Sequence, residues 1–194
     1  MADDILVYDD LISIEKQNEI ESLHTGPYFG WYLSSSPNHY TVDPYEEGSL
    51  KNHNIPVKDD VQFVHTFIKE GEITSSYYDV VHELFGEIAK VANIKIEGFY
   101  RVKSNLQLKT TFLNSEFCNT PHIDSWRDHT VVIYYVNDSD GNTKIFQEEH
   151  GEYKLIKQVS PKKGRFVVFN GKHYHAGTHP NIHDKRIVIN FNFI

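Results

Sequence analysis

The sequence has little cysteine, no long apolar run and no cluster of basic residues. Its single cysteine, Cys118, excludes an intramolecular disulfide framework and any zinc site built from several cysteines. No stretch approaches the roughly 20 continuous apolar residues of a membrane span, and the acidic start MADDILVYDD does not resemble a signal peptide. Lys and Arg number 19 against 27 Asp and Glu, a net charge of −8. We therefore expect a soluble cytoplasmic protein with no membrane and no nucleic-acid partner.

The remaining composition is typical of a folded chain, with an excess of histidine. Apolar residues make up 39% and aromatic residues 13% of the 194 residues, which is enough to build a core. We expect a single domain over 1–194. Helices and a variable loop region would occupy 1–97, and a β-rich core would occupy 98–194. The 12 histidines are the feature that most directly suggests chemistry.

Hydrophobic periodicity predicts two helices in the first half of the chain. Residues 11–25 carry apolar side chains at mostly helical spacing, with Ser13 as a plausible N-cap. Residues 75–92 carry a longer apolar stripe and are the stronger helix prediction. Residues 26–57 are rich in loop-forming residues, and such a long loop could cover a substrate as a lid. Residues 58–70 fit either a helix or a strand.

The second half of the chain is typical of short β-strands. Its segments are rich in Val, Ile, Tyr, Phe and Thr and are bounded by turn residues. We expect strands over 94–102, 104–113, 121–124, 130–137, 143–147, 152–159, 164–170 and 186–194. An Asp-Gly pair within 137–142 predicts a hairpin. About eight mostly antiparallel strands predict a mainly β (α+β) fold, a double-stranded β-helix or jelly roll, with the N-terminal helices packed on one sheet.

The two faces of the final strand differ in chemistry, because successive side chains point to opposite sides. One face is wholly apolar and is expected to pack against the helices: Ile187, Ile189, Phe191 and Phe193. The other face carries Arg186, Val188, Asn190 and Asn192. Polar side chains on a strand this apolar indicate an enclosed polar pocket.

Three separate stretches could meet at one metal ion. In His122-Ile123-Asp124, an extended strand projects the imidazole and the carboxylate to the same side, with Cα atoms roughly 6.5–7 Å apart. A second imidazole would come from the segment FNGKHYHAGTHP, where we choose His175. Two histidines and one carboxylate form the facial triad of non-haem Fe(II) oxygenases. Arg186 could bind the far carboxylate of a 2-oxo acid, because guanidinium pairs bidentately with carboxylate.

These motifs resemble the Fe(II)/2-oxoglutarate-dependent dioxygenases, specifically the prolyl-4-hydroxylase-like branch. The resemblance covers roughly 98–194 and rests on HID, on VVIYYVND followed by DGNTKIF, on GRFVVFNGKHYHAGTHP and on RIVINFNF. It implies Fe(II), 2-oxoglutarate as cosubstrate and O₂. The implied residues are the iron ligands His122, Asp124 and His175, and the cosubstrate-binding residues Arg186 and Tyr135. Asn190 shares the face of Arg186 and joins the cofactor-binding candidates.

The resemblance has one departure. Relatives often carry a further cosubstrate-binding tyrosine shortly before the HxD motif, and Phe112 occupies that place here. The contact would then be lost or come from another residue, with Gln107, Lys109 and Asn105 as weaker candidates.

Alternatives for the distal histidine remain open at this stage. His175 is preferred because a small residue and a proline-containing turn follow it, and His173 and His179 are the other choices. A rival zinc site would place His175, His179 and His183 along one face of a helix. The glycine and the proline inside that span argue against a helix.

These patterns predict a 2-oxoglutarate-dependent hydroxylase that releases succinate and CO₂. Its partner would be a peptide or protein substrate, with prolyl as one possible residue, or a small metabolite. One alternative is a cupin-like metal-binding isomerase or small-acid-binding module without oxygenase activity, which would not need Arg186. Another is a jelly-roll interaction protein whose histidines are incidental, which predicts no metal uptake.

Overall fold

Two antiparallel sheets form the frame of the computed structural model, which describes residues 5–34, 54–57, 61–92, 94, 97–110 and 116–194. The larger sheet has the spatial order β1 (Leu6–Tyr8), β9 (Phe166–Asn170), β6 (Thr130–Tyr135), β11 (Lys185–Phe193), β5 (Phe99–Leu108), β3 (Gln62–Lys69) and β2 (Tyr32–Ser34), and β4 (Glu72–Ile73) pairs with β3. The smaller sheet has the order β10 (Tyr174–Gly177), β7 (Thr143–Glu149) and β8 (Glu152–Val159). This is the mainly β jelly-roll architecture that the strand pattern predicts.

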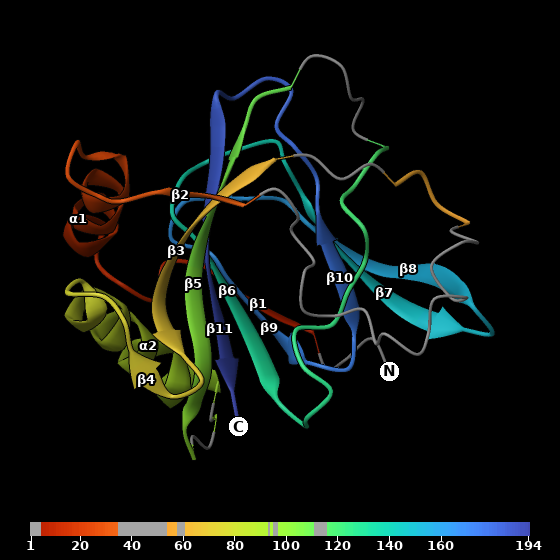
Figure 1. Cartoon of the computed structure of the whole chain (residues 1–194), viewed down its shortest axis with the longest axis horizontal. Coiled ribbons are helices and arrows are strands. Elements are labelled where there is room, and N and C mark those ends of the chain that lie inside the picture. The colour runs from red at the N-terminus through yellow and green to blue at the C-terminus, as the bar shows by residue number, and fades with distance from the viewer. Residues whose placement is uncertain (1–4, 35–53, 58–60, 93, 95–96, 111–115) are drawn as a thin grey trace.

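Helices α1 (Ile14–Thr25) and α2 (Tyr78–Ala92) cover the outer face of the larger sheet, and the smaller sheet lies on its other side (Figure 1). Ser13 caps α1 as predicted, since its hydroxyl accepts a hydrogen bond from the backbone N–H of Lys16 at 3.2 Å. In α2, the apolar stripe is buried through Val81, Leu84, Phe85 and Ile88. The predicted helices at 11–25 and 75–92 are therefore confirmed, each beginning about three residues later than expected.

The last strand buries both of its faces, each in a different core. Ile187, Ile189, Phe191 and Phe193 belong to the cluster that includes α2 and Ile20 of α1. Val188 instead joins a cluster between the two sheets, together with residues of β6 such as Ile133 and Tyr135. The prediction that the apolar face of this strand packs against the helices is confirmed, and its polar face lies between the sheets.

Several local predictions about strands were wrong. The segment 137–142 does not form a hairpin, because β6 pairs with β9 and β11 while β7 pairs with β8 and β10. The segment instead crosses from the larger to the smaller sheet. The predicted strands 94–102 and 104–113 are one continuous strand, β5, and 121–124 contributes only a single bridge, between His122 and His175.

Hydrophobic periodicity left residues 58–70 undecided between a helix and a strand. The structure places strand β3 in this segment. The one tight hairpin of the smaller sheet joins β7 and β8 through His150 and Gly151, whose φ angles of 57° and 85° suit the type I′ turn that matches strand twist. Most of the predicted lid at 26–57 lies outside the described residues.

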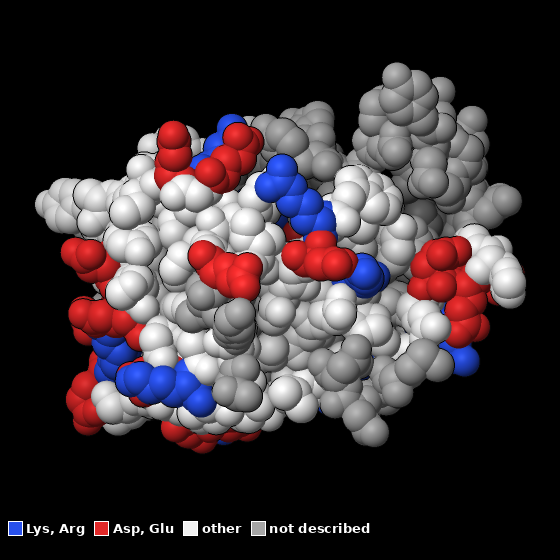
Figure 2. All heavy atoms as spheres, turned by 90° about the horizontal axis from the view of Figure 1, so that it is seen from below, with Lys and Arg blue, Asp and Glu red and all other residues white. Residues whose placement is uncertain are grey.

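The surface carries charges of both signs. Acidic and basic side chains are interspersed on the face seen in Figure 2, and the basic ones do not gather into one area there. Among the described residues, no helix combines the length and the apolar character required to span a bilayer.

Candidate functional site

His122, Asp124 and His175 converge as the sequence predicts. One donor atom from each lies within 4.8 Å of the others, and they are the one such cluster of metal-ligating side chains among the described residues. The Nε2 atom of His122 is 3.9 Å from Oδ1 of Asp124, and the Nε2 atom of His175 is 3.5 Å from Oδ2. Two imidazoles and one carboxylate at these separations match the donor set of the Fe(II) facial triad.

A backbone bridge brings the two imidazoles together although they are far apart in the sequence. The N–H of His122 donates to the carbonyl of His175 at 3.1 Å, and the N–H of His175 donates back at 2.9 Å. The two rings lie with centroids 4.7 Å apart. The site is therefore built where β10 of the smaller sheet meets the HxD segment.

Backbone carbonyls set the tautomer of both imidazoles. Nδ1 of His122 lies 3.1 Å from the carbonyl of Thr120, and Nδ1 of His175 lies 3.4 Å from the carbonyl of His173. Because a carbonyl only accepts, each Nδ1 carries the proton and each Nε2 presents a lone pair to the cluster. Burial, reinforced by the neighbouring His175, lowers the pKa of His122 to about 3, so this ring is neutral and ready to bind a metal.

Three side chains orient the Asp124 carboxylate. Arg101 forms an ion pair with Oδ1, and Asn190 and Asn192 donate to Oδ2 at 2.9 and 2.8 Å. Burial alone would raise the pKa of Asp124, but the Arg101 charge and the adjacent imidazoles outweigh it and hold this pKa well below its usual range. The carboxylate is therefore charged and fixed in direction.

Arg186 is buried, with 4% of its surface exposed. Its guanidinium donates to the carbonyl of Gly141 at 2.7 Å, to Oε1 of Gln107 at 2.9 Å and to Oγ1 of Thr143 at 2.7 Å. Among the described residues, no carboxylate lies within ion-pair distance of it. Because a buried cation without a counter-charge is costly, this arrangement suits an anionic ligand.

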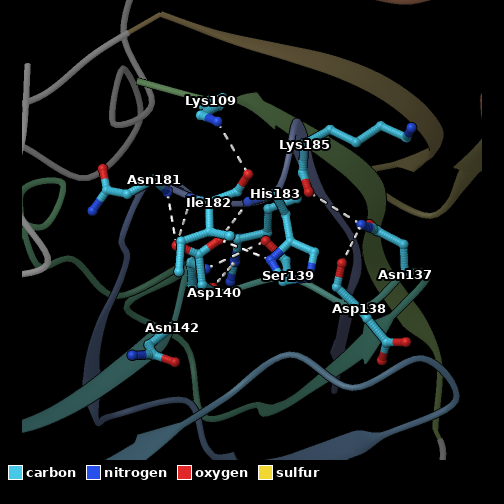
Figure 3. A network of polar contacts seen from close by, with 12 residues as sticks. Lys109, Asn137, Asp138, Ser139, Asp140, Asn142, Asn181, Ile182, His183 and Lys185 are labelled. Carbon is cyan, nitrogen blue, oxygen red and sulfur yellow. Dashed lines mark hydrogen bonds and ion pairs between the residues drawn. The ribbon is translucent and has the colours of Figure 1, made fainter. Parts of the chain in front are cut away.

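A loop network anchors the carbonyl that binds Arg186. Asp140 accepts hydrogen bonds from the backbone N–H groups of Asn181, Ile182 and His183, at 2.8, 3.0 and 2.9 Å, as Figure 3 shows. Burial opposes ionisation, but these donors dominate and hold the pKa of Asp140 below its usual range. Next to it, a Cβ added at Gly141 would lie only 2.5 Å from the carbonyl oxygen of Thr178. The Asp-Gly pair that suggested a hairpin thus serves to pack this loop against Arg186.

One cavity joins the metal cluster to Arg186. Its walls include His122, His175, Asn190 and Arg186, and its apolar floor is formed by Ile133 and Val188. Its volume, taken as the space open to the centre of a water-sized sphere, is about 50 Å³.

Of the two other cosubstrate-binding candidates, Tyr135 lies beside Thr143 and Asn190 lines the cavity. The Tyr135 hydroxyl donates to Oγ1 of Thr143 at 2.7 Å, and the Arg186 guanidinium carbon is 5.9 Å from the Tyr135 ring centroid. Asn190 lines the cavity and also holds Asp124. Direct contact of either residue with a cosubstrate stays a prediction.

The other histidines of 173–183 lie outside the cluster. His179 is within 3.4 Å of the Gln107 amide, and His183 pairs with Asp140 at 3.0 Å. His173 supplies its backbone carbonyl to the ring of His175. The zinc alternative on a helix is excluded, because His175 lies on strand β10.

The three residues that could replace the missing tyrosine contact to the cosubstrate lie in different places in the structure. Gln107 and Asn105 line the cavity, whereas Lys109 reaches outward to the carbonyl of Ile182 at 3.2 Å. Phe112 lies outside the described residues.

Sequence reasoning missed Arg101, Lys103, Thr143 and the role of Asn192. Arg101, Lys103, Asn105 and Gln107 share one face of β5, and the last three line the cavity. The alternation that revealed the polar face of the last strand is also visible here. The alternation along β5 was not recognised, because the sequence pattern predicts two strands in this segment, 94–102 and 104–113.

Comparison with protein-family models matches residues 108–194 to the 2OG-Fe(II) oxygenase superfamily, a stretch that contains the whole triad and Arg186. The similarity to that superfamily therefore rests on the C-terminal part of the chain. Enzymes of that superfamily use Fe(II), 2-oxoglutarate and O₂, and the His122, Asp124 and His175 donors fit the metal while the uncompensated Arg186 fits a dicarboxylate. A comparison with curated proteins returned no match.

Solved structures support the same fold at low sequence identity. A 2OG-Fe(II) oxygenase family oxidoreductase from Burkholderia pseudomallei has a TM-score of 0.67 and 10% identity, covering 98% of this chain and 84% of its own. A Trichoplax adhaerens prolyl hydroxylase, in complex with a hypoxia inducible factor peptide fragment, has a TM-score of 0.61 and 11% identity, covering 98% of this chain and 83% of its own. SnoN, an alpha ketoglutarate dependent epimerase from nogalamycin biosynthesis, has a TM-score of 0.62 and 9% identity over 98% and 77%. At these identities the similarity shows that the chains share a fold.

Proposed function

We propose that this oxygenase hydroxylates a C–H bond of a peptidyl residue, with prolyl as one possibility, or of a small metabolite. In the overall reaction, substrate, 2-oxoglutarate and O₂ give hydroxylated substrate, succinate and CO₂. The observation that carries the proposal is that Arg186, a buried cation without a carboxylate partner among the described residues, lines the same cavity as His122 and His175.

The triad would hold Fe(II), which supplies the activation of O₂ when bound. His122 offers the Nε2 atom of a neutral ring, His175 points its Nε2 at the cluster, and Asp124 offers a charged oxygen. Because Arg101, Asn190 and Asn192 already fix the carboxylate, it needs little reorganisation to bind a metal.

Arg186 would bind the far carboxylate of 2-oxoglutarate. Its three hydrogen bonds, to Gly141, Gln107 and Thr143, hold the guanidinium plane in place before the ligand arrives. The apolar side chains of Ile133 and Val188, which also line the cavity, would limit the water beside the cosubstrate. The protein thus positions the cosubstrate and shields it from side reactions.

Two lines of support favour hydroxylation. The fold matches a prolyl hydroxylase that was solved with a peptide fragment, and the sequence motifs resemble the prolyl-4-hydroxylase-like branch. A shared fold alone leaves the reaction type open, since an epimerase also has this fold. The hydroxylation of a C–H bond therefore needs its own test.

The test is product analysis by mass spectrometry. The protein is incubated with Fe(II), 2-oxoglutarate and air, with a panel of prolyl peptides and free amino acids. We expect succinate together with a substrate product heavier by one oxygen atom, and ¹⁸O₂ should label that product. His122→Ala should abolish both products. Succinate with an epimerised substrate of unchanged mass would contradict the proposal.

A further inference from the structure

The cavity contains a second cation, Lys103, which the chemistry described so far does not use. Lys103 lies on β5, where it pairs in register with Asn190 of β11. The next residue, Ser104, points to the opposite side and contacts His24 of α1 at 2.8 Å. Because neighbouring side chains of a strand alternate, Lys103 faces the cavity.

Lys103 differs from the other cations of the site, because no described residue forms a hydrogen bond or ion pair with its side chain. Arg101 is paired with Asp124, and Arg186 has three acceptors. Among the described residues, none accepts a hydrogen bond from the Lys103 ammonium or forms an ion pair with it. Burial lowers its pKa to about 8, with Asp124 acting in the opposite direction. The amine is therefore still largely protonated at neutral pH, so the cavity holds an uncompensated positive charge.

The position of Lys103 separates it from the carboxylate clamp of Arg186. Gln107, which binds Arg186, lies four residues further along β5, so its Cα is about 13 Å from that of Lys103. Arg186 would bind one carboxylate of the cosubstrate and a bound metal would neutralise the other, so neither would balance Lys103. A second anion is needed.

Nearby acceptors also lack donors. Within the part of the chain that the structure describes, Oδ1 of Asn105 and Oδ1 of Asn119 are buried without a hydrogen-bond partner, and both residues line the cavity. Asn119 is 4% exposed, and Asn105 lies on β5 between Lys103 and Gln107. Buried carbonyl oxygens of this kind are normally satisfied by N–H or O–H donors, so they favour a ligand that brings N–H groups.

We infer that Lys103 and Asn105 bind the substrate through a carboxylate next to an N–H group, the chemistry of a free α-amino acid or of the C-terminal residue of a peptide. Lys103 pairs with the carboxylate, and the Asn105 amide oxygen accepts from the N–H. This inference rests on the proposed function, because it assumes that the cosubstrate occupies the Arg186 end of the cavity.

The first test compares each amino acid with its carboxamide. Free amino acids, C-terminally free peptides and their amidated forms are assayed for stimulation of 2-oxoglutarate turnover. We expect stimulation by at least one acid and at least tenfold less by its amide. The response to free amino acids or to peptides identifies the source of the carboxylate. Equal stimulation by acids and amides would overturn the inference.

The second test uses variants and a binding measurement. Lys103→Met should raise KM for the stimulating acid at least tenfold while the Kd for 2-oxoglutarate stays within twofold, and Lys103→Arg should restore part of the loss. Lys154→Met, an exposed lysine of β8, is the matched control. Calorimetry with the same acids, on protein loaded with Mn(II) and N-oxalylglycine, should rank the wild type first in affinity for the acid, Lys103→Arg second and Lys103→Met last. If Lys103→Met instead weakens 2-oxoglutarate binding, Lys103 belongs to the cosubstrate site and the inference is wrong.

The two proposals fail differently. Absence of any 2-oxoglutarate turnover in the wild type would contradict the proposed function, and the calorimetric arm would still decide whether acids bind through Lys103. Turnover that no acid stimulates, combined with no calorimetric binding of acids, would contradict only the role of Lys103.

Discussion

Arg101 and Asn192 are register partners on β5 and β11, and their side chains meet at the carboxylate of Asp124. Arg101 also donates to Oδ1 of Asn192 at 3.1 Å. The metal-ligating carboxylate is thus held by two strands of the larger sheet, while both imidazoles come from the junction with the smaller sheet. The sheet register itself determines the geometry of the site.

Replacing Arg101 should make stability depend on metal. Arg101→Met leaves the Asp124 carboxylate, 2% exposed, without its counter-charge, which should cost about 3 kcal/mol in the metal-free protein. A bound divalent ion replaces that charge. Urea unfolding with a chelator and with Mn(II) should therefore show a larger gain from metal in the variant than in the wild type, with Arg101→Lys in between. Equal gains from metal in all three proteins would contradict the role assigned to Arg101.

Of the histidines in 173–183, only His175 should be needed for metal binding. His175→Ala removes a ligand, so Mn(II) affinity measured by calorimetry should fall by more than the roughly 10–100-fold expected for losing a partner of a ligand. His173→Ala is the matched control, because the His173 group that contacts the ring of His175 is its backbone carbonyl, which alanine retains, and it should bind Mn(II) like the wild type. The reverse result would place the wrong imidazole in the triad.

Gly141 should be intolerant of even a methyl group. A Cβ there would lie 2.5 Å from the carbonyl oxygen of Thr178 and 2.9 Å from Cδ of Arg186. We expect Gly141→Ala to displace Arg186 and weaken 2-oxoglutarate binding at least tenfold in calorimetry. Gly86→Ala in α2 is the control, because nothing lies within 4 Å of its added Cβ. It should leave binding unchanged and stabilise the helix by about 0.5–1 kcal/mol. Wild-type cosubstrate affinity in Gly141→Ala would show that the close approach is unimportant.

The buried His24 should make folding sensitive to acid. It is 1% exposed and is bound to the Ile20 carbonyl and the Ser104 hydroxyl. Burial lowers its pKa from 6.5 to about 4, and nearby His65 contributes in the same direction. As the pH falls through 6.5, His24 of the unfolded chain takes up a proton, whereas His24 of the folded chain stays neutral until about pH 4. The neutral, buried His24 therefore contributes fully to folding stability above pH 6.5, and this contribution is lost progressively below it.

The measurement is urea unfolding at pH 7.5 and 5.5. The wild type should lose roughly 1 kcal/mol more than His24→Gln between these two values. If both proteins lose the same free energy, His24 does not titrate as its burial implies.

Local pattern and residue type predicted much of the fold and the site. The two-faced final strand fixed both where the helices pack and where the pocket lies, because alternation holds along any regular strand. The triad was accessible because His122 and Asp124 are two residues apart, a spacing with a direct geometric meaning. The choice of His175 needed the resemblance to a known family as well as the pattern.

The parts that failed depend on pairing between distant segments. Asp140 and Gly141 have the local signature of a hairpin, but their actual roles depend on residues 181–183 and on Arg186, which only the folded chain brings near. The pairing of Arg101 with Asp124 was missed for the same reason, since the two residues are 23 positions apart, although strand alternation could have placed Arg101 on the polar face of β5. Local propensity cannot show such contacts.

The central claim is that the triad and Arg186 form one site, and the most direct test is the affinity for 2-oxoglutarate measured by calorimetry with Mn(II) and with a chelator. We expect at least tenfold tighter binding with metal in the wild type, and no metal dependence in Asp124→Ala. Arg186→Met should weaken binding under both conditions while its affinity for Mn(II) is unchanged. The account would be contradicted if the wild type bound 2-oxoglutarate equally well with and without metal, or if Arg186→Met bound 2-oxoglutarate with normal affinity.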